Sequence, residues 1–192
     1  MKVVAFCGSP RKKGNTRQAL EMVCEVLESE GISTSIIQIG GKKIHGCIAC
    51  YKCGKEKDGR CHGHKDDKLN EYIEAMRKAD GILIGSPTYF SNVSPEVKAL
   101  IDRAGLVARM NGSFFKRKVG AAVVVARRCG ASHVFSSINY FFLISEMIVP
   151  GSSYWNMGLA LKPGEIQKDE EAVKTFKDLG TNMAWLLKKI NK

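Results

Sequence analysis

Short apolar runs alternate with helical patterns five times along this 192-residue chain, and no other feature constrains the fold as strongly. The predicted strands cover residues 2–7, 32–39, 81–85, 119–126 and 148–154. The predicted helices cover residues 16–30, 67–79, 95–104, 135–147 and 170–190, with Asp66 or Asp67 as the cap of the second. Because crossovers between parallel strands are right-handed, this order predicts an α/β fold: a doubly wound, five-stranded parallel sheet with helices on both faces. A chain of this length suits a single domain spanning residues 1–192.

Polar loops follow three of the predicted strands, at residues 8–16, 86–92 and 127–132. In open parallel sheets, ligands bind beyond the carboxyl ends of the strands, where the strand order reverses. We therefore expect the three loops to meet at one crevice.

The first loop, Gly8-Ser-Pro-Arg-Lys-Lys-Gly-Asn-Thr16, enters the amino end of a helix, where free backbone N–H groups favour an anion. Its candidate phosphate ligands are Ser9, Arg11, Lys12, Asn15 and Thr16. It matches neither the Gly-x-Gly-x-x-Gly fingerprint nor the phosphate loop that ends in Gly-Lys-Ser/Thr. The loop is therefore predicted to bind phosphate by a different arrangement.

The other two loops offer surfaces for a planar ring. The second, Ser86-Pro-Thr-Tyr-Phe-Ser-Asn92, contains two aromatic residues and small polar groups. The third, Arg127-Arg-Cys-Gly-Ala-Ser132, has a glycine that lets backbone approach a ring and two guanidinium groups for an anion. The candidate residues in these loops are Pro87, Thr88, Tyr89, Phe90, Asn92, Arg127, Arg128 and Gly130.

Four cysteines lie within fifteen residues, Cys47-x2-Cys50-x2-Cys53-x7-Cys61, in a cysteine-rich loop at about 44–65. Thiolates are soft ligands that hold iron–sulfur clusters or zinc. The C-x2-C-x2-C run is that of bacterial ferredoxins, but the fourth cysteine arrives late and no proline follows it. The residues alone leave a cluster, a zinc ion, and free or disulfide-bonded thiols as alternatives.

Together these motifs resemble the NADPH-dependent FMN reductase family of flavodoxin-like proteins, over roughly residues 1–150. The resemblance is carried by residues 8–16, by Asp80-Gly-Ile-Leu-Ile-Gly-Ser-Pro-Thr-Tyr-Phe90 and by Val97-Lys-Ala-Leu-Ile-Asp-Arg103. It implies FMN, with its phosphate on the first loop and its isoalloxazine ring between the other two. It also implies a homodimer or homotetramer in which a neighbouring subunit covers the flavin.

The cysteine run is further similar to the iron–sulfur flavoprotein branch of that family. This similarity implies that Cys47, Cys50, Cys53 and Cys61 hold a [4Fe–4S] cluster. The implied activity is an FMN-dependent oxidoreductase that moves electrons from NAD(P)H, or from a ferredoxin-like donor, through FMN. No side chain in the sequence requires a role as general acid or base, so no residue is predicted to be catalytic. The alternatives are a flavodoxin-like electron carrier without turnover and a zinc or thiol redox sensor.

Composition constrains the partners and the compartment. The net charge of +11 comes from lysines interleaved with acids, without an aromatic-studded basic stripe, so nucleic acid is not an expected partner. No apolar stretch approaches the roughly 20 residues that a membrane helix needs. Seven cysteines suit metal or redox chemistry in a reducing compartment, and we expect a cytoplasmic protein.

Overall fold

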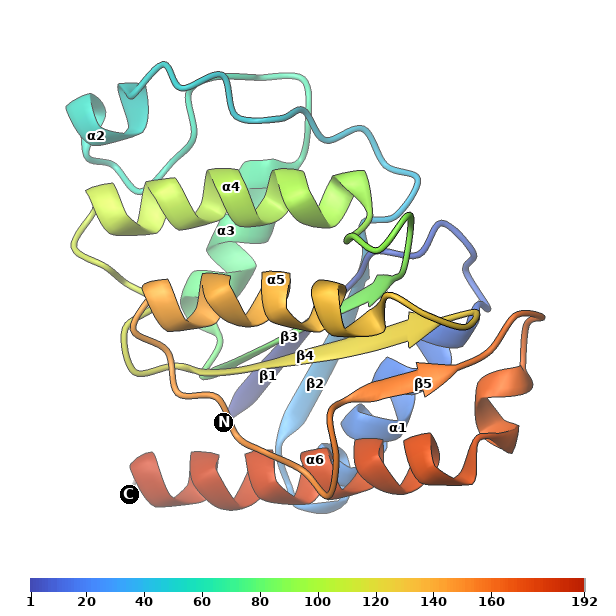
Figure 1. Cartoon of the computed structure of the whole chain (residues 1–192). Coiled ribbons are helices and arrows are strands. Elements are labelled where there is room, and N and C mark those ends of the chain that lie inside the picture. The colour runs from blue at the N-terminus through green and yellow to red at the C-terminus, as the bar shows by residue number, and fades with distance from the viewer. Residues whose placement is uncertain (192) are drawn as a thin grey trace.

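The computed structural model, which describes residues 1–191, places five strands in one parallel sheet (Figure 1). The strands are β1 (Lys2–Cys7), β2 (Ser33–Gln38), β3 (Gly81–Pro87), β4 (Val119–Ala126) and β5 (Met157–Leu159). Their spatial order is β2-β1-β3-β4-β5, and every pair of neighbours is parallel. This is the flavodoxin-like doubly wound order, which reverses between β1 and β3. The predicted fold class is confirmed.

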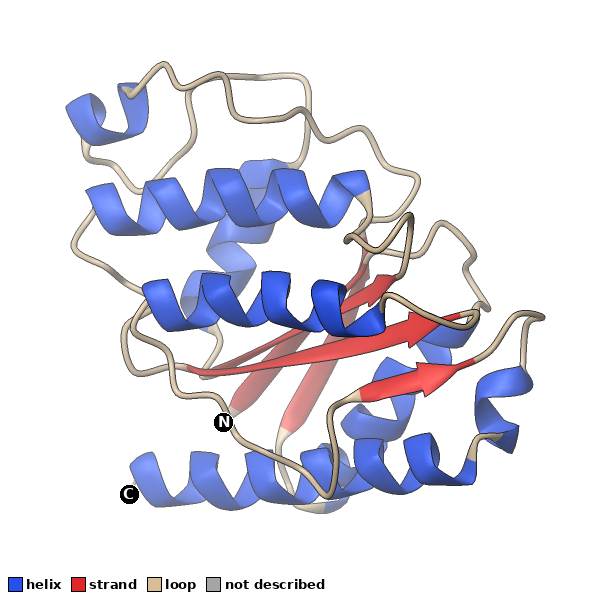
Figure 2. Cartoon of the chain, in the orientation of Figure 1, coloured by secondary structure: helices blue, strands red, loops and turns tan. Residues whose placement is uncertain are grey.

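Helices cover both faces of the sheet, as Figure 2 shows. The helices are α1 (Asn15–Ser29), α2 (Lys52–Glu56), α3 (Leu69–Lys78), α4 (Pro95–Met110), α5 (Ala131–Ile144), the 3-10 helix η1 (Glu165–Lys168) and α6 (Glu170–Ile190). One core packs α1 and α6 against the sheet, and the other packs α3, α4 and α5 against the opposite face. All eight residues of β4 are buried, which explains why its sequence is apolar throughout.

Most predicted helix boundaries agree with the structure to within a few residues. Pro95 is the first residue of α4, where its missing N–H costs nothing, and the Ser94 side chain accepts from the Val97 N–H. The predicted cap of α3 is wrong, because Lys68 occupies that position. Asp67 does accept from the Leu69 N–H at 3.3 Å, but it also pairs with an arginine of α4.

The last strand was predicted at residues 148–154, and this prediction is wrong. Ile148 makes one parallel bridge to Val119, with hydrogen bonds of 2.9 Å to Lys118 and Gly120. The chain then leaves the sheet at Pro150, which has no N–H to donate to a ladder. It rejoins β4 only at β5, where Met157 pairs with Val124.

Two further differences concern helices. The fourth predicted helix starts at Ala131 rather than at residue 135, because Gly130 adopts a φ of 86° and turns the chain directly into α5. The short helix α2 lies inside the cysteine-rich loop and carries Cys53, and the periodicity of the sequence did not predict it. Among the described residues, no helix is long and apolar enough to cross a membrane.

Gly40 shows how tightly β2 is joined to the loop after β1. A Cβ at Gly40 would overlap the backbone of Ser9 and Gly8, atoms that cannot rotate away. We predict that Gly40→Ala lowers the free energy of unfolding by about 1–3 kcal/mol, the usual cost of overpacking. Urea denaturation measures this difference. Gly46→Ala is the control, because no atom lies within 4 Å of a Cβ placed there. Equal stability of the two variants would contradict the prediction.

Candidate functional site

A cleft of about 180 Å³ opens at the carboxyl ends of β1, β3 and β4, next to the reversal of strand order. Eight of the thirteen predicted nucleotide-binding residues line it: Ser9, Arg11, Asn15, Thr16, Pro87, Thr88, Tyr89 and Arg127. The other lining residues are Val125, Ala160 and Leu161. The expected convergence of the three loops is therefore observed, and the segment after β5 supplies a fourth wall that the sequence did not indicate.

The amino end of α1 forms the polar end of this cleft. Its cap is Gly14, which offers no side chain to the first-turn N–H groups. A helix leaves four backbone N–H groups unsatisfied at this end, and they attract an anion. Ser9 and Thr16 are almost fully buried beside them, while Arg11 is exposed at the rim. This end of the cleft therefore suits a phosphate.

Asn15 has a structural role in addition to the predicted contact with phosphate, which stays a prediction. Its amide nitrogen donates to the Lys162 carbonyl at 2.9 Å, and its oxygen accepts from the Gly164 N–H at 2.9 Å and the Ile166 N–H at 3.3 Å. Both acceptor positions of the amide oxygen and one of its two N–H donors are thus directed at the segment after β5. Asn15 holds that segment over the cleft.

One polar atom in the cleft has no partner. The Thr88 hydroxyl is buried and makes no hydrogen bond within the described part of the chain. An unsatisfied buried hydroxyl costs about 1–3 kcal/mol, so such groups commonly mark a ligand position. Beside it, burial raises the pKa of the Tyr89 phenol, and nearby Arg11 only partly opposes this effect. Tyr89 is therefore neutral at physiological pH.

The remaining predicted ring contacts lie at a strained turn on the rim. Backbone hydrogen bonds of 2.9 Å join Tyr89 and Asn92 in both directions. The two residues between them, Phe90 and Ser91, both have positive φ, and the Phe90 ring is fully exposed. Gly130 packs against Ser91 so closely that a Cβ would overlap it. Strain of this kind persists where the surrounding structure enforces it, often at ligand sites.

Five predicted residues lie outside the cleft lining: Lys12, Phe90, Asn92, Arg128 and Gly130. Lys12 and Arg128 are exposed, and Asn92 uses its side-chain oxygen for the adjacent Val93 N–H at 2.8 Å. A direct part for these residues in binding stays a prediction.

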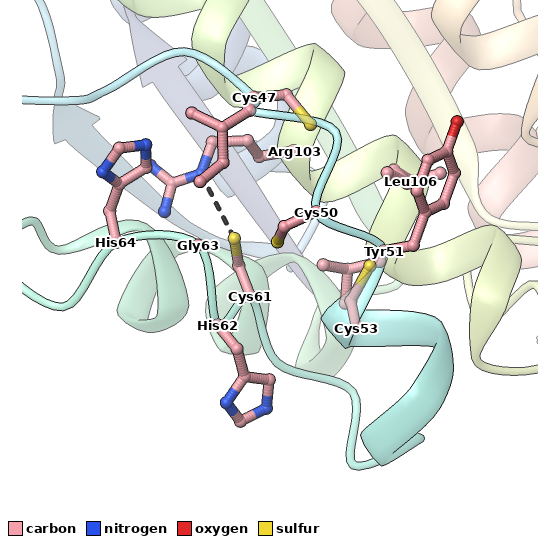
Figure 3. A pocket seen from close by; sticks show the side chains of 12 residues that line it. Cys47, Cys50, Tyr51, Cys53, Cys61, His62, Gly63, His64, Arg103 and Leu106 are labelled. Atoms are coloured by element: carbon pink, nitrogen blue, oxygen red, sulfur yellow. Dashed lines mark hydrogen bonds between the residues drawn. The ribbon is translucent and has the colours of Figure 1, made fainter.

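The four clustered cysteines surround a second pocket, between the cysteine-rich loop and α4 (Figure 3). Cys47 and Cys50 are exposed, Cys61 is half-buried and Cys53 is buried. Ile48, Tyr51, Leu106 and Val107 line the same pocket, so its walls are mainly apolar. The structure thus brings together all four predicted metal ligands.

Backbone strain is concentrated in the same loop. Ala49 and Tyr51, on either side of Cys50, have φ of 50° and 53°, and neither is glycine. Such conformations cost of order 1–3 kcal/mol each and persist only where neighbouring contacts impose them. Two asparagines anchor other parts of the loop. Asn70 exchanges hydrogen bonds of 2.8 and 3.0 Å with the Cys61 backbone, and Asn111 donates to the Cys53 carbonyl at 3.1 Å.

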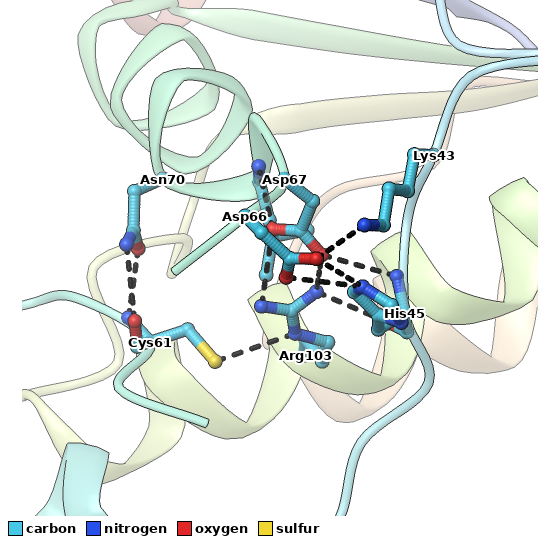
Figure 4. A network of polar contacts seen from close by, with 8 residues as sticks. Lys43, His45, Cys61, Asp66, Asp67, Asn70 and Arg103 are labelled. Atoms are coloured by element: carbon cyan, nitrogen blue, oxygen red, sulfur yellow. Dashed lines mark hydrogen bonds and ion pairs between the residues drawn. The ribbon is translucent and has the colours of Figure 1, made fainter. Parts of the chain in front are cut away.

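A buried ion pair fastens the loop to the body of the protein (Figure 4). The side chains of Arg103, on α4, and Asp67 are 0% and 1% exposed and form a two-pronged contact. Burial by itself raises the pKa of Asp67 and is the largest single influence, but the hydrogen bonds from Arg103 and from the His45 and Leu69 N–H groups, with the Arg103 charge, together outweigh it and lower the pKa. Arg103 also donates to the His45 carbonyl at 3.1 Å and to the Cys61 Sγ at 3.3 Å. Removing one partner of such a pair costs about 3–5 kcal/mol.

Sulfur spacing distinguishes between metals. In the described part of the chain, no three of these sulfurs lie within 4.8 Å of one another. A tetrahedral zinc ion with Zn–S bonds near 2.3 Å would bring its ligand sulfurs to about 3.8 Å. The sulfurs are therefore not arranged as a preformed tetrahedral zinc site, while four thiols remain a suitable donor type for an iron–sulfur centre. His62, by contrast, pairs with Asp58 and points away from the sulfurs in Figure 3.

Two of the other cysteines are structural. Cys7 and Cys24 are buried in the core, and burial raises the pKa of the Cys24 thiol to about 11. Both behave as small apolar side chains. Cys129 is exposed in the loop after β4.

Comparison with known sequences identifies the family. The pattern described as NADPH-dependent FMN reductase matches residues 1–162, which include every lining residue of both pockets. This chain belongs to the NADPH-dependent FMN reductase family. It is 36% identical to an iron–sulfur flavoprotein of Methanocaldococcus jannaschii, covering 100% of both chains. It is 32% identical to an iron–sulfur flavoprotein of Methanosarcina thermophila, covering 100% of this chain and 98% of that one.

Solved structures support the fold of this FMN reductase family member. An NAD(P)H:quinone oxidoreductase from Methanothermobacter marburgensis superposes with a TM-score of 0.70 at 15% identity, covering 95% of this chain and 98% of that chain. A flavodoxin from the domain Archaea superposes with a TM-score of 0.63 at 19% identity, covering 98% and 99% of the two chains. At these identities the likeness shows the flavodoxin-like fold alone.

The FMN expected from the family fits the cleft at the strand ends. The uncapped amino end of α1 suits its phosphate, and the unpaired Thr88 hydroxyl suits a polar group of the bound molecule. The four cysteines fit an iron–sulfur centre by donor type and because all four line one pocket. These two fits concern separate pockets that share no lining residue.

Thr88→Val separates a binding role from a structural one. We predict that the variant stabilises the flavin-free protein slightly, because it removes an unsatisfied buried hydroxyl without changing the shape. We also predict about tenfold weaker FMN binding, which corresponds to a loss of about 1.4 kcal/mol. Urea denaturation of flavin-free protein and fluorescence titration with FMN measure the two effects. A variant that binds FMN as tightly as the wild type would contradict the assignment.

Proposed function

We propose that this protein is an FMN-dependent oxidoreductase that receives electrons from NAD(P)H or a ferredoxin-like donor and holds a [4Fe–4S] cluster on Cys47, Cys50, Cys53 and Cys61. The observation that carries the proposal is the presence, in one member of this family, of a nucleotide cleft and a separate pocket lined by four cysteines. The names of the relatives, iron–sulfur flavoproteins, support the same reading.

The residues of the cleft would bind and orient the cofactor. The amino end of α1, with Ser9 and Thr16, would hold the phosphate, and exposed Arg11 would add a charge-assisted hydrogen bond. Pro87, Thr88 and Tyr89 would lie along the ring, and the turn at Phe90 would limit its access to water. FMN, when bound, supplies hydride acceptance from a nicotinamide and the ability to pass electrons singly or in pairs.

The cysteine pocket would supply a one-electron centre. Cys53 is the buried ligand, and burial raises the pKa of its thiol, with neighbouring Cys61 adding to that effect. A bound cation reverses this preference, because metal coordination deprotonates a thiol. Cys47 and Cys50 lie at the exposed side, where a donor or acceptor protein has access.

We propose a homodimer or homotetramer as the working form, with one domain per chain. Support comes from α5, on which Tyr140, Leu143 and Ile144 are 70%, 60% and 62% exposed. Three large apolar side chains on one helix favour burial against another surface. An assembly in which a neighbouring subunit covers the flavin would add groups from that subunit to the cleft.

Cysteine variants test the cluster separately from the flavin. We predict that Cys61→Ser lowers iron from about four atoms per chain to a small fraction of that number, because the centre needs four thiolates. FMN content is expected to stay the same, since Cys61 does not line the cleft. The matched control is Cys129→Ser, which removes an exposed cysteine outside the loop and should keep all its iron. Equal iron in both variants would refute the proposed ligand set.

Steady-state turnover separates the enzyme from a passive electron carrier. We predict that the anaerobic holoprotein oxidises NADPH or NADH continuously when a quinone or free flavin is supplied as acceptor. Absorbance at 340 nm follows the reaction, and heat-inactivated protein with added FMN is the control. If reduced ferredoxin alone drives turnover, the ferredoxin-like donor is the correct one. If neither donor sustains turnover, the protein is an electron carrier.

A further inference from the structure

Arg103 stands out because it is one of the largest side chains that the protein buries completely, and it carries a charge. Burying a guanidinium is costly unless each N–H group finds a partner. Nη1 donates to Asp67 and to the His45 carbonyl, and Nη2 donates to Asp67. Nε is the remaining donor nitrogen of the guanidinium. Nε donates to the Cys61 Sγ at 3.3 Å. A buried cation is therefore directed at one cysteine of the pocket.

The contacts of Arg103 join the two ends of the cysteine-rich loop. His45 precedes Cys47 in the chain, Asp67 follows Cys61, and one guanidinium contacts both residues as well as the sulfur (Figure 4). The other anchors, Asn70 and Asn111, are neutral and hold backbone groups only. Among the arginines in the described residues, Arg103 alone lines the pocket.

The partners of the other cysteines differ in kind. The Cys47 sulfur accepts from the Ala49 backbone N–H at 3.4 Å, and backbone N–H groups of Gly54 and Cys53 itself interact with the Cys53 sulfur. Cys61 receives its hydrogen bond from a charged side chain, and bonds with a charged donor are stronger than neutral ones. Hydrogen bonds to the ligating sulfurs and the local charge are two of the factors that set a cluster's potential.

We propose that Arg103 is a positioning residue of the cluster site that also raises the reduction potential of the cluster through its Nε–H bond to Cys61. This inference rests on the proposed [4Fe–4S] centre. Reduction adds one negative charge to the cluster and its thiolates, and a fixed donor with a positive charge stabilises that added charge more than it stabilises the oxidised form. The carboxylate of Asp67 lowers the net charge of the pair, so the directed N–H bond carries the effect.

The test is a redox titration of anaerobically purified holoprotein, followed by electron paramagnetic resonance, with wild type, Arg103→Lys and Arg109→Gln. The lysine in Arg103→Lys keeps a positive charge opposite Asp67. Its single ammonium group lacks the separate Nε–H that donates to the Cys61 sulfur. Arg109→Gln removes a positive charge from an exposed position on the same helix. We expect Arg103→Lys to lower the ratio of reduced to oxidised cluster about tenfold at a given potential, a shift of about 59 mV for one electron. Arg109→Gln should stay close to the wild type.

The flavin midpoint serves as an internal reference, because Arg103 does not line the cleft. A lowered cluster potential with an unchanged flavin potential supports the proposal, whereas a purely structural role would leave the potential of a fully loaded cluster in place. Arg103→Lys with about four irons and the wild-type potential would overturn it. Wild-type protein with FMN but without iron would instead refute the proposed cluster, irrespective of Arg103.

A second measurement keeps Arg103 in place and is used if the Arg103→Lys protein does not fold or does not load iron. Protein labelled with ¹⁵N-arginine, with Arg60→Gln to remove the arginine beside Cys61 in sequence, is reduced and examined by pulsed paramagnetic resonance. A ¹⁵N hyperfine coupling to the reduced cluster supports the direct Nε–H bond. The absence of any arginine coupling in a protein with full iron would overturn it.

Discussion

The reversal of strand order between β1 and β3 determines where this molecule can bind a nucleotide. All five strands end at one edge, and the loops after β1 and β3 diverge there to opposite faces of the sheet. The cleft between them receives the amino end of α1 on one side and the Pro87–Tyr89 segment on the other. Gly40 and Asn15 then fix the surrounding segments, the first by close backbone contact and the second by three hydrogen bonds.

The cysteine-rich loop depends on a different interaction, the buried pair of Arg103 and Asp67. The loop has little regular structure apart from α2, so it does not hold itself in place through a ladder of backbone hydrogen bonds. Asn70 of α3, Arg103 of α4 and Asn111, which follows α4, take over this task, each contacting a cysteine or its backbone. The strained backbone on either side of Cys50 shows that the loop is held in one shape and does not merely follow its local preferences.

Sequence reasoning predicted the sheet and the convergence of the loops because these follow from local patterns. Apolar runs, the helical spacing of apolar residues and the proline at the start of α4 each act within a few residues. The predicted position of β5 was wrong. Ile148 does pair with β4, but for one residue only, and the sequence does not show that the chain then leaves the sheet at Pro150. The use of Asn15 was also missed, since its partners lie about 150 residues away. Arg103 was recognised only as part of a family motif, because burial of an arginine depends on the tertiary partners that neutralise it.

The most direct test of the central claim, that one chain carries both FMN and a four-iron cluster, is the cofactor stoichiometry of freshly and anaerobically purified protein. Flavin released by acid, iron and acid-labile sulfide are measured on the same sample, together with its visible spectrum. We predict about one FMN, four irons and four sulfides per chain, with broad brown absorbance beneath the flavin bands. Flavin without iron would contradict the cluster, and protein with neither cofactor that also rejects added FMN would contradict the proposed function.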